Sequence, residues 1–102
     1  ALNANYVERK NKLEIDFLQK ELRVLREQIE ALSLANEAAS LAFESVDKKY
    51  VAGLNSYNDY LQALESKFKA QSDLELAKNE FEITKARYYF VSGIDIKERI
   101  MQ

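Results

Sequence analysis

The sequence predicts an all-α protein, a long antiparallel two-helix coiled-coil hairpin formed by a single domain over residues 1–102. The first observation is that proline is absent and glycine occurs only at Gly53 and Gly93. These residues are the main interruptions of a helix, so the chain offers two stops. The second is that Ala, Leu, Glu, Lys, Gln and Arg, which favour helices, dominate both intervals. The third is a heptad spacing of apolar residues, which predicts helices that pack in pairs.

The first helix is expected from about residue 6 to about residue 52. Apolar and small residues alternate there in steps of four and three, which is the pattern of a coiled-coil seam, the line of side chains that faces the partner helix. A strand would need a period of two. The expected seam consists of Leu18, Leu22, Leu25, Ile29, Leu32, Asn36, Ala39, Phe43, Val46 and Tyr50.

The second helix is expected from about residue 56 to about residue 92, followed by a short tail over residues 93–102. Its seam is interrupted, because the step from Gln71 to Leu74 breaks the alternation and predicts a locally overwound supercoil. The expected seam members are Tyr57, Leu61, Leu64, Phe68, Gln71, Leu74, Ala77, Phe81, Thr84, Tyr88 and Val91.

The break between the helices, over residues 53–55, is a predicted tight turn. Gly53 can adopt the left-handed conformation that ends a helix. Ser56 and Asp59 have the spacing of a capping box, which opens the next helix. A connection this short makes the two helices antiparallel.

Both helices carry apolar residues off the seam, so we expect lateral packing against neighbouring hairpins. These residues are Ile15, Phe17, Leu34, Ala38, Leu41, Ala42, Tyr60, Leu76, Ile83, Tyr89 and Phe90. The Ala- and Ser-rich stretch over residues 31–42 fits either close helix approach or plain helix propensity. Between Arg26 and Lys48 all the charged residues are acidic, which fits either a solvated face or the wall of a cation-favouring passage.

Composition argues against several classes of function. The net charge is −2, from 15 basic and 17 acidic residues, which gives no reason to expect nucleic-acid binding. Histidine and cysteine are absent, so we expect no enzyme activity, no metal site and no cofactor. No apolar run is long enough for a membrane-spanning helix. The chain begins with Ala1 and its one methionine is Met101, so we interpret it as a fragment or a processed chain.

The residues around the turn form a pattern that is specific in combination. Tyr50-Val51-Ala52-Gly53-Leu54 is followed by Asp59, Leu61 and Ala63, and Ala86-Arg87-Tyr88 precedes Gly93. Between about residues 30 and 95, these features resemble the TolC-like outer membrane efflux proteins, the outer membrane factors. The resemblance implies that the chain is a hairpin of a periplasmic α-barrel within a homotrimeric channel for multidrug efflux or type I secretion. The channel would be in the cell outer membrane, with this segment in the periplasm and membrane contact made only by parts outside this chain.

The resemblance also implies partners and sites. The tip residues Ala52, Gly53 and Leu54 would bind a periplasmic adaptor, the membrane fusion protein, and so connect indirectly to an inner-membrane pump. Ala52 stands where the family has valine. The candidate entrance gate is Asn55, Asp59 and Gln62, of which only Asp59 keeps the charge found in the family's best-known member. The alternative is a structural coiled-coil hairpin or an adaptor hairpin without a conduit, although the Arg-Leu-x-x-Asp pattern of adaptor tips is absent.

Overall fold

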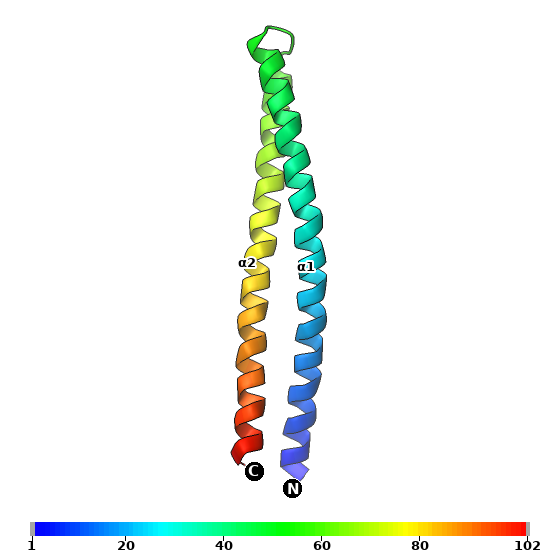
Figure 1. Cartoon of the computed structure of the whole chain (residues 1–102), viewed down its shortest axis with the longest axis vertical. Helices are drawn as coiled ribbons and strands as arrows, with labels where there is room; N and C mark the ends of the chain where they lie inside the picture. Colours follow the sequence, from blue (N-terminus) through cyan, green and yellow to red (C-terminus); the bar gives the residue numbers. More distant parts are fainter. Residues whose placement is uncertain (1, 102) are drawn as a thin grey trace. The chain divides into compact units, whose positions relative to one another are not determined.

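Two long helices make up the computed structural model, which describes the backbone of residues 2–101 and the side chains of residues 6–94, 97 and 100. α1 is Leu2–Val51 and α2 is Tyr57–Met101 (Figure 1). The residues group into two compact units. Unit 1 is Ala1–Arg26 with Asn79–Gln102, and unit 2 is Glu27–Lys78. Each unit pairs a segment of α1 with an antiparallel segment of α2, and the described part of each is wholly helical apart from the turn in unit 2.

α2 continues past Gly93 to Met101, where the sequence analysis places a tail. Gly53 has a positive φ of 78°, whereas the φ of Gly93 is not positive. A glycine inside a helix costs only about 1 kcal/mol relative to alanine, so it does not end a helix unless it takes a left-handed conformation. The expectation of a tail over residues 93–102 is therefore wrong.

In unit 1 a small core lies between the two helix segments. Leu18 and Leu25 of α1 are buried, as are Thr84 and Val91 of α2. Beside this core the Gln19 side-chain amide donates a hydrogen bond to the Tyr88 hydroxyl over 3.2 Å. The contact joins residues 69 positions apart in the sequence and so fixes the pairing of the two segments.

In unit 2 the buried residues among those described are Leu74 and Ala77. Most of its seam is only half-buried, because two helices cannot enclose a side chain on every side. The α1 seam is as predicted from Leu18 to Val46, where every expected member is buried or half-buried. It also extends toward the N-terminus through Asn11 and Ile15, both half-buried, so placing Ile15 off the seam was wrong.

The α2 seam differs from the prediction. Tyr57, Phe68 and Gln71 are exposed, with 57% of the Phe68 surface open to solvent, whereas Tyr60 and Lys67 are half-buried. Leu61 and Leu64, both predicted seam members, are half-buried as expected, but one unbroken heptad series of buried and half-buried residues runs beside them through Tyr60, Ala63, Lys67, Ala70, Leu74, Ala77, Phe81, Thr84, Tyr88 and Val91. The interruption at Gln71 and the placement of Tyr60 off the seam are therefore wrong.

The predicted register of α2 was wrong because small and amphipathic residues occupy part of its seam. Ala63 and Ala70 fill narrow positions between the helices, while Lys67 packs its aliphatic stem and leaves its charge at the surface. The Lys67 ammonium lies 4.8 Å from the centre of the Phe43 ring, within the range of a cation–π contact. A seam predicted from the largest apolar residues therefore passes through Phe68 instead of Lys67.

A second line of apolar side chains lies on the solvent side of each helix. In unit 1 it includes Leu13, Phe17 and Val24 of α1, all exposed. Each follows a seam residue by two positions, which is about 200° around a helix at 3.6 residues per turn, so it lies opposite the partner helix. The same offset relates the other exposed members to their seams, and these are Ile83 and Phe90 in unit 1 and Leu34, Leu41 and Leu76 in unit 2. We call these exposed apolar residues of the two helices together the outer apolar stripe.

Candidate functional site: the helical tip

The tip loop, residues 52–56, begins with a Schellman motif that ends α1. The Gly53 amide donates to the Tyr50 carbonyl over 3.0 Å, and the Leu54 amide donates to the Lys49 carbonyl over 2.8 Å. These two bonds satisfy carbonyl groups that the end of the helix leaves free. The motif requires a left-handed residue, and Gly53 supplies it with φ 78°. The prediction that Gly53 ends the first helix in this conformation is confirmed.

α2 begins at the other end of the tip loop with a capped turn. The Ser56 hydroxyl accepts a hydrogen bond from the Asp59 amide over 3.1 Å, and the Tyr60 amide donates to the Ser56 carbonyl over 3.1 Å. Ser56 is therefore the N-cap residue. The predicted capping box is present in its Ser56 half, whereas the Asp59 carboxylate forms no hydrogen bond with the described residues. Asp59 contributes its amide and places a carboxylate in the first helical turn, where the helix dipole favours negative charge.

The three predicted docking residues lie together at the surface. Ala52, Gly53 and Leu54 are all exposed, and 75% of the Leu54 surface is open to solvent. Val51, which the sequence analysis did not select, is 80% exposed beside them. The tip thus presents two large aliphatic side chains, one at the end of α1 and one on a loop whose backbone is held by its own hydrogen bonds.

The three candidate gate residues differ in exposure. Asp59 and Gln62 are exposed near the start of α2, whereas Asn55 is half-buried in the tip loop. No described side chain forms an ion pair with Asp59. Within one chain, Asp59 is therefore a free surface carboxylate near the tip.

An aromatic cluster lies next to the tip loop, and the linear pattern of the sequence did not predict it. It consists of Phe43, Tyr50, Tyr57 and Tyr60. The rings of Tyr50 and Tyr57 have centroids 6.3 Å apart, and those of Phe43 and Tyr60 are 5.5 Å apart. These tilted arrangements are favourable for aromatic pairs. The signal in the sequence was the heptad position of Tyr60, three residues before Ala63 and seven before Lys67.

No family model, curated protein or solved structure matches this chain. Within residues 2–101, neither helix has a segment long and apolar enough to cross a membrane. The side chains that the structure describes bring together no group of three or more Asp and Glu residues suited to hold a metal ion. The tip and the outer apolar stripe are therefore the features from which a function is inferred.

Proposed function

We propose that this chain is the periplasmic helical hairpin of a TolC-like homotrimeric outer membrane channel, and that its tip docks a periplasmic adaptor protein. The observation that carries the proposal is the tip itself, where two large apolar side chains, Val51 at 80% and Leu54 at 75% exposed, flank a left-handed glycine. Exposed aliphatic side chains at an ordered helix end and loop lose solvent-accessible apolar area when a partner covers them, which favours binding.

The internal hydrogen bonds of the tip add to this support. Both the Schellman bonds and the Ser56 cap are complete within residues 48–60, so the loop does not need a partner to become ordered. A preorganised surface binds with a smaller loss of conformational entropy than a flexible one. The absence of a β-carbon at Gly53 also lets a partner backbone approach closely.

The outer apolar stripe supports lateral neighbours. An isolated helical hairpin has no reason to keep leucine and phenylalanine opposite its seam, because that face remains in water. Leu13, Phe17 and Leu41 nevertheless lie there. Packing of hairpins side by side, as in an α-barrel built from three chains, would cover them.

The proposed setting follows from the resemblance around Gly53. The channel would belong to the cell outer membrane, with this hairpin in the periplasm and an inner-membrane pump connected through the adaptor. The exposed acids Glu27, Glu30, Glu37 and Glu44 would then give the conduit a preference for cations. A structural hairpin without a conduit is the alternative, and it would not require the outer apolar stripe to be covered.

The docking proposal is tested by crosslinking from the tip in cells that produce the complete channel protein. A photoreactive amino acid at position 54 should crosslink to an adaptor that itself carries a helical hairpin, whereas the same probe at the exposed position 65 should not. Leu54→Ser should lower adaptor crosslinking from a probe at position 51 and lower export, with normal surface assembly. Unchanged crosslinking and export in Leu54→Ser and Gly53→Asp would contradict the proposal.

The gate proposal needs its own measurement. If three Asp59 side chains form a ring at the entrance, Asp59→Ala should raise the conductance of the channel in a lipid bilayer and increase antibiotic leakage. Glu65→Ala is the matched control, because Glu65 is also an exposed carboxylate of α2 and does not belong to the candidate gate. Equal conductance of the Asp59→Ala and unmodified channels would leave Asp59 as a residue of the capped turn only.

A further inference from the structure

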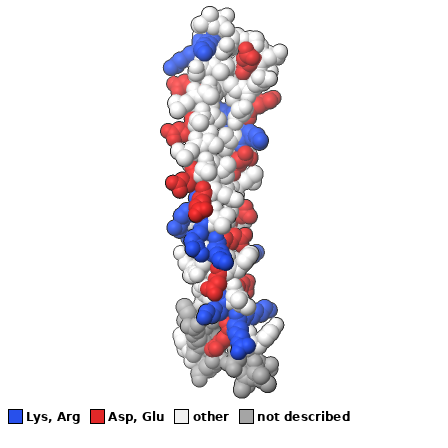
Figure 2. All heavy atoms as spheres, turned by 90° about the vertical axis from the view of Figure 1, so that its right-hand side faces the viewer, with Lys and Arg blue, Asp and Glu red and all other residues white. Residues whose placement is uncertain are grey.

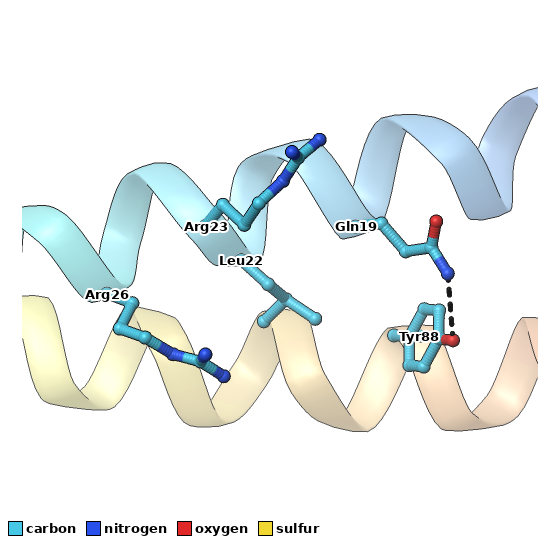
Figure 3. A pocket seen from close by; sticks show the side chains of 5 residues that line it. All are labelled: Gln19, Leu22, Arg23, Arg26 and Tyr88. Atoms are coloured by element: carbon cyan, nitrogen blue, oxygen red, sulfur yellow. Dashed lines mark hydrogen bonds between the residues drawn. The ribbon is translucent and has the colours of Figure 1, made fainter.

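A hollow of about 460 Å³ opens on the surface of unit 1, and the residues that line it are distant in sequence from the tip loop. Gln19, Leu22, Arg23 and Arg26 of α1 line it together with Tyr88 of α2 (Figure 3). The proposed function uses none of these residues. In Figure 3 the Leu22 side chain lies between the two arginines, and Gln19 and Tyr88 stand together at one end.

The hydrogen bond in the hollow leaves one donor free. The Gln19 Nε2 donates to the Tyr88 Oη over 3.2 Å, so the phenolic oxygen acts as the acceptor in this contact. A tyrosine hydroxyl can accept and donate at the same time. The Tyr88 proton is therefore available for an acceptor outside the protein.

Both guanidinium groups are also free to bind. Arg23 and Arg26 are exposed, and neither forms an ion pair with any carboxylate among the described side chains. Glu27 and Glu30 follow them at helical spacing and still do not pair with them. Figure 2 shows Lys and Arg side chains gathered on the face of the molecule that carries this part of α1. The hollow therefore combines two positive charges with a hydroxyl donor.

We propose that this hollow binds an organic oxyanion, a carboxylate or phosphate group attached to an apolar body. Arginine recognises both groups through paired charge-assisted hydrogen bonds. The Tyr88 hydroxyl would donate to a further oxygen of the ligand. Leu22, between the two charges, offers an apolar contact that an inorganic anion cannot use. Because the hollow is open to solvent, the ligand exchanges rapidly and binds weakly.

The test is a titration of the 102-residue chain with phenyl phosphate, followed by NMR of the arginine Nε–H groups and the Gln19 amide. Saturable shifts should appear at Arg23, Arg26 and Gln19 and weaken as salt is added. Benzoate should produce the same pattern. Inorganic phosphate should bind about threefold or more weakly, because it makes no contact with Leu22, and phenol should produce no shift at the arginines.

Two double variants of equal charge separate a site from general attraction to a basic surface. Arg23→Gln with Arg26→Gln should weaken phenyl phosphate binding about tenfold or more. Arg9→Gln with Arg87→Gln removes two exposed arginines that do not line the hollow and should change the affinity less than about twofold. Tyr88→Phe should weaken binding while keeping the ring.

The circular dichroism of each variant reports whether the helices are retained, and the arginines are exposed, so we expect unchanged helicity. Equal losses of affinity in the two double variants, or shifts that never saturate, would overturn the proposal. Equal affinity for phenyl phosphate and inorganic phosphate would overturn the apolar part of it.

Discussion

The Tyr60 ring stacks on the Tyr50 ring, with centroids 4.9 Å apart and planes inclined by 28°. The contact joins the last turn of α1 to the first turn of α2, so it closes the hairpin of unit 2 directly below the tip loop. Aromatic pairs of this kind contribute about 0.5–1.5 kcal/mol beyond the area that they bury. The stack should therefore hold the two ends of the tip loop at a fixed separation.

A double-mutant cycle tests this stack. Tyr50→Ala and Tyr60→Ala should each lower the free energy of unfolding, and the double variant should lose less than the sum, with a coupling of about 0.5–1.5 kcal/mol. Urea unfolding followed by circular dichroism measures it. Tyr50→Ala combined with Leu34→Ala is the control, because about 24 Å of helix separates the two residues and their effects should add. Additive effects in the Tyr50 and Tyr60 cycle would show that the stack contributes nothing.

Lys67 and Phe68 provide a test of the α2 seam. Phe68→Ala should change the free energy of unfolding by less than about 0.5 kcal/mol, as at other exposed positions. Lys67→Ala should cost about 1 kcal/mol, because it removes the packed stem and the contact with Phe43. Lys67→Met keeps most of the stem and should recover part of that loss. If Phe68→Ala lowered the free energy of unfolding more than Lys67→Ala, the result would support the register predicted from the largest apolar residues.

The helices and their pairing could be predicted because the evidence for them is local and repetitive. Leu18, Leu25 and Phe43 lie on the alternating four-and-three seam, and Gly53 marks the turn. The register of the first half of α2 could not, since it depends on which side chains face α1. Ala63 and Lys67 have no apolar bulk to indicate a seam, whereas Phe68 does, so hydrophobicity alone favoured the wrong line. The end of α2 was misplaced because a glycine such as Gly93 stops a helix only when its φ becomes positive.

The two glycines should respond to alanine in opposite directions. Gly53→Ala should lower the free energy of unfolding by about 1–2 kcal/mol, because an L-residue is strained in the left-handed conformation. No atom lies within 4 Å of an added β-carbon at either glycine, so steric contact does not contribute. Gly93→Ala should raise the free energy of unfolding by about 0.5–1 kcal/mol, since Gly93 is helical. A stabilising Gly53→Ala in urea unfolding would contradict the Schellman geometry.

In the candidate site, as in the fold, the local motifs could be predicted from the sequence and the contacts between the two helices could not. Gly53 and Ser56 belong to local motifs, so the turn and the cap follow from their spacing. The exposure of Val51 and the clustering of Phe43, Tyr50 and Tyr60 depend on how the chain folds back on itself, which a linear pattern does not specify. The Arg23 and Arg26 hollow was missed for a similar reason, because its fifth residue, Tyr88, comes from the other helix.

The outer apolar stripe should make the isolated chain self-associate. Leu13 and Phe17 are both exposed on α1, and covering them would remove apolar surface from water at about 25 cal/mol per Å². The weight-average mass from sedimentation equilibrium should rise with protein concentration, and Leu13→Ser with Phe17→Ser should lower that rise while the helicity is retained. Leu54→Ser is the matched control, since it removes an equally exposed leucine at the tip without changing the stripe. A chain that stays monomeric at high concentration, or an association weakened only by Leu54→Ser, would show that the stripe is not a lateral interface.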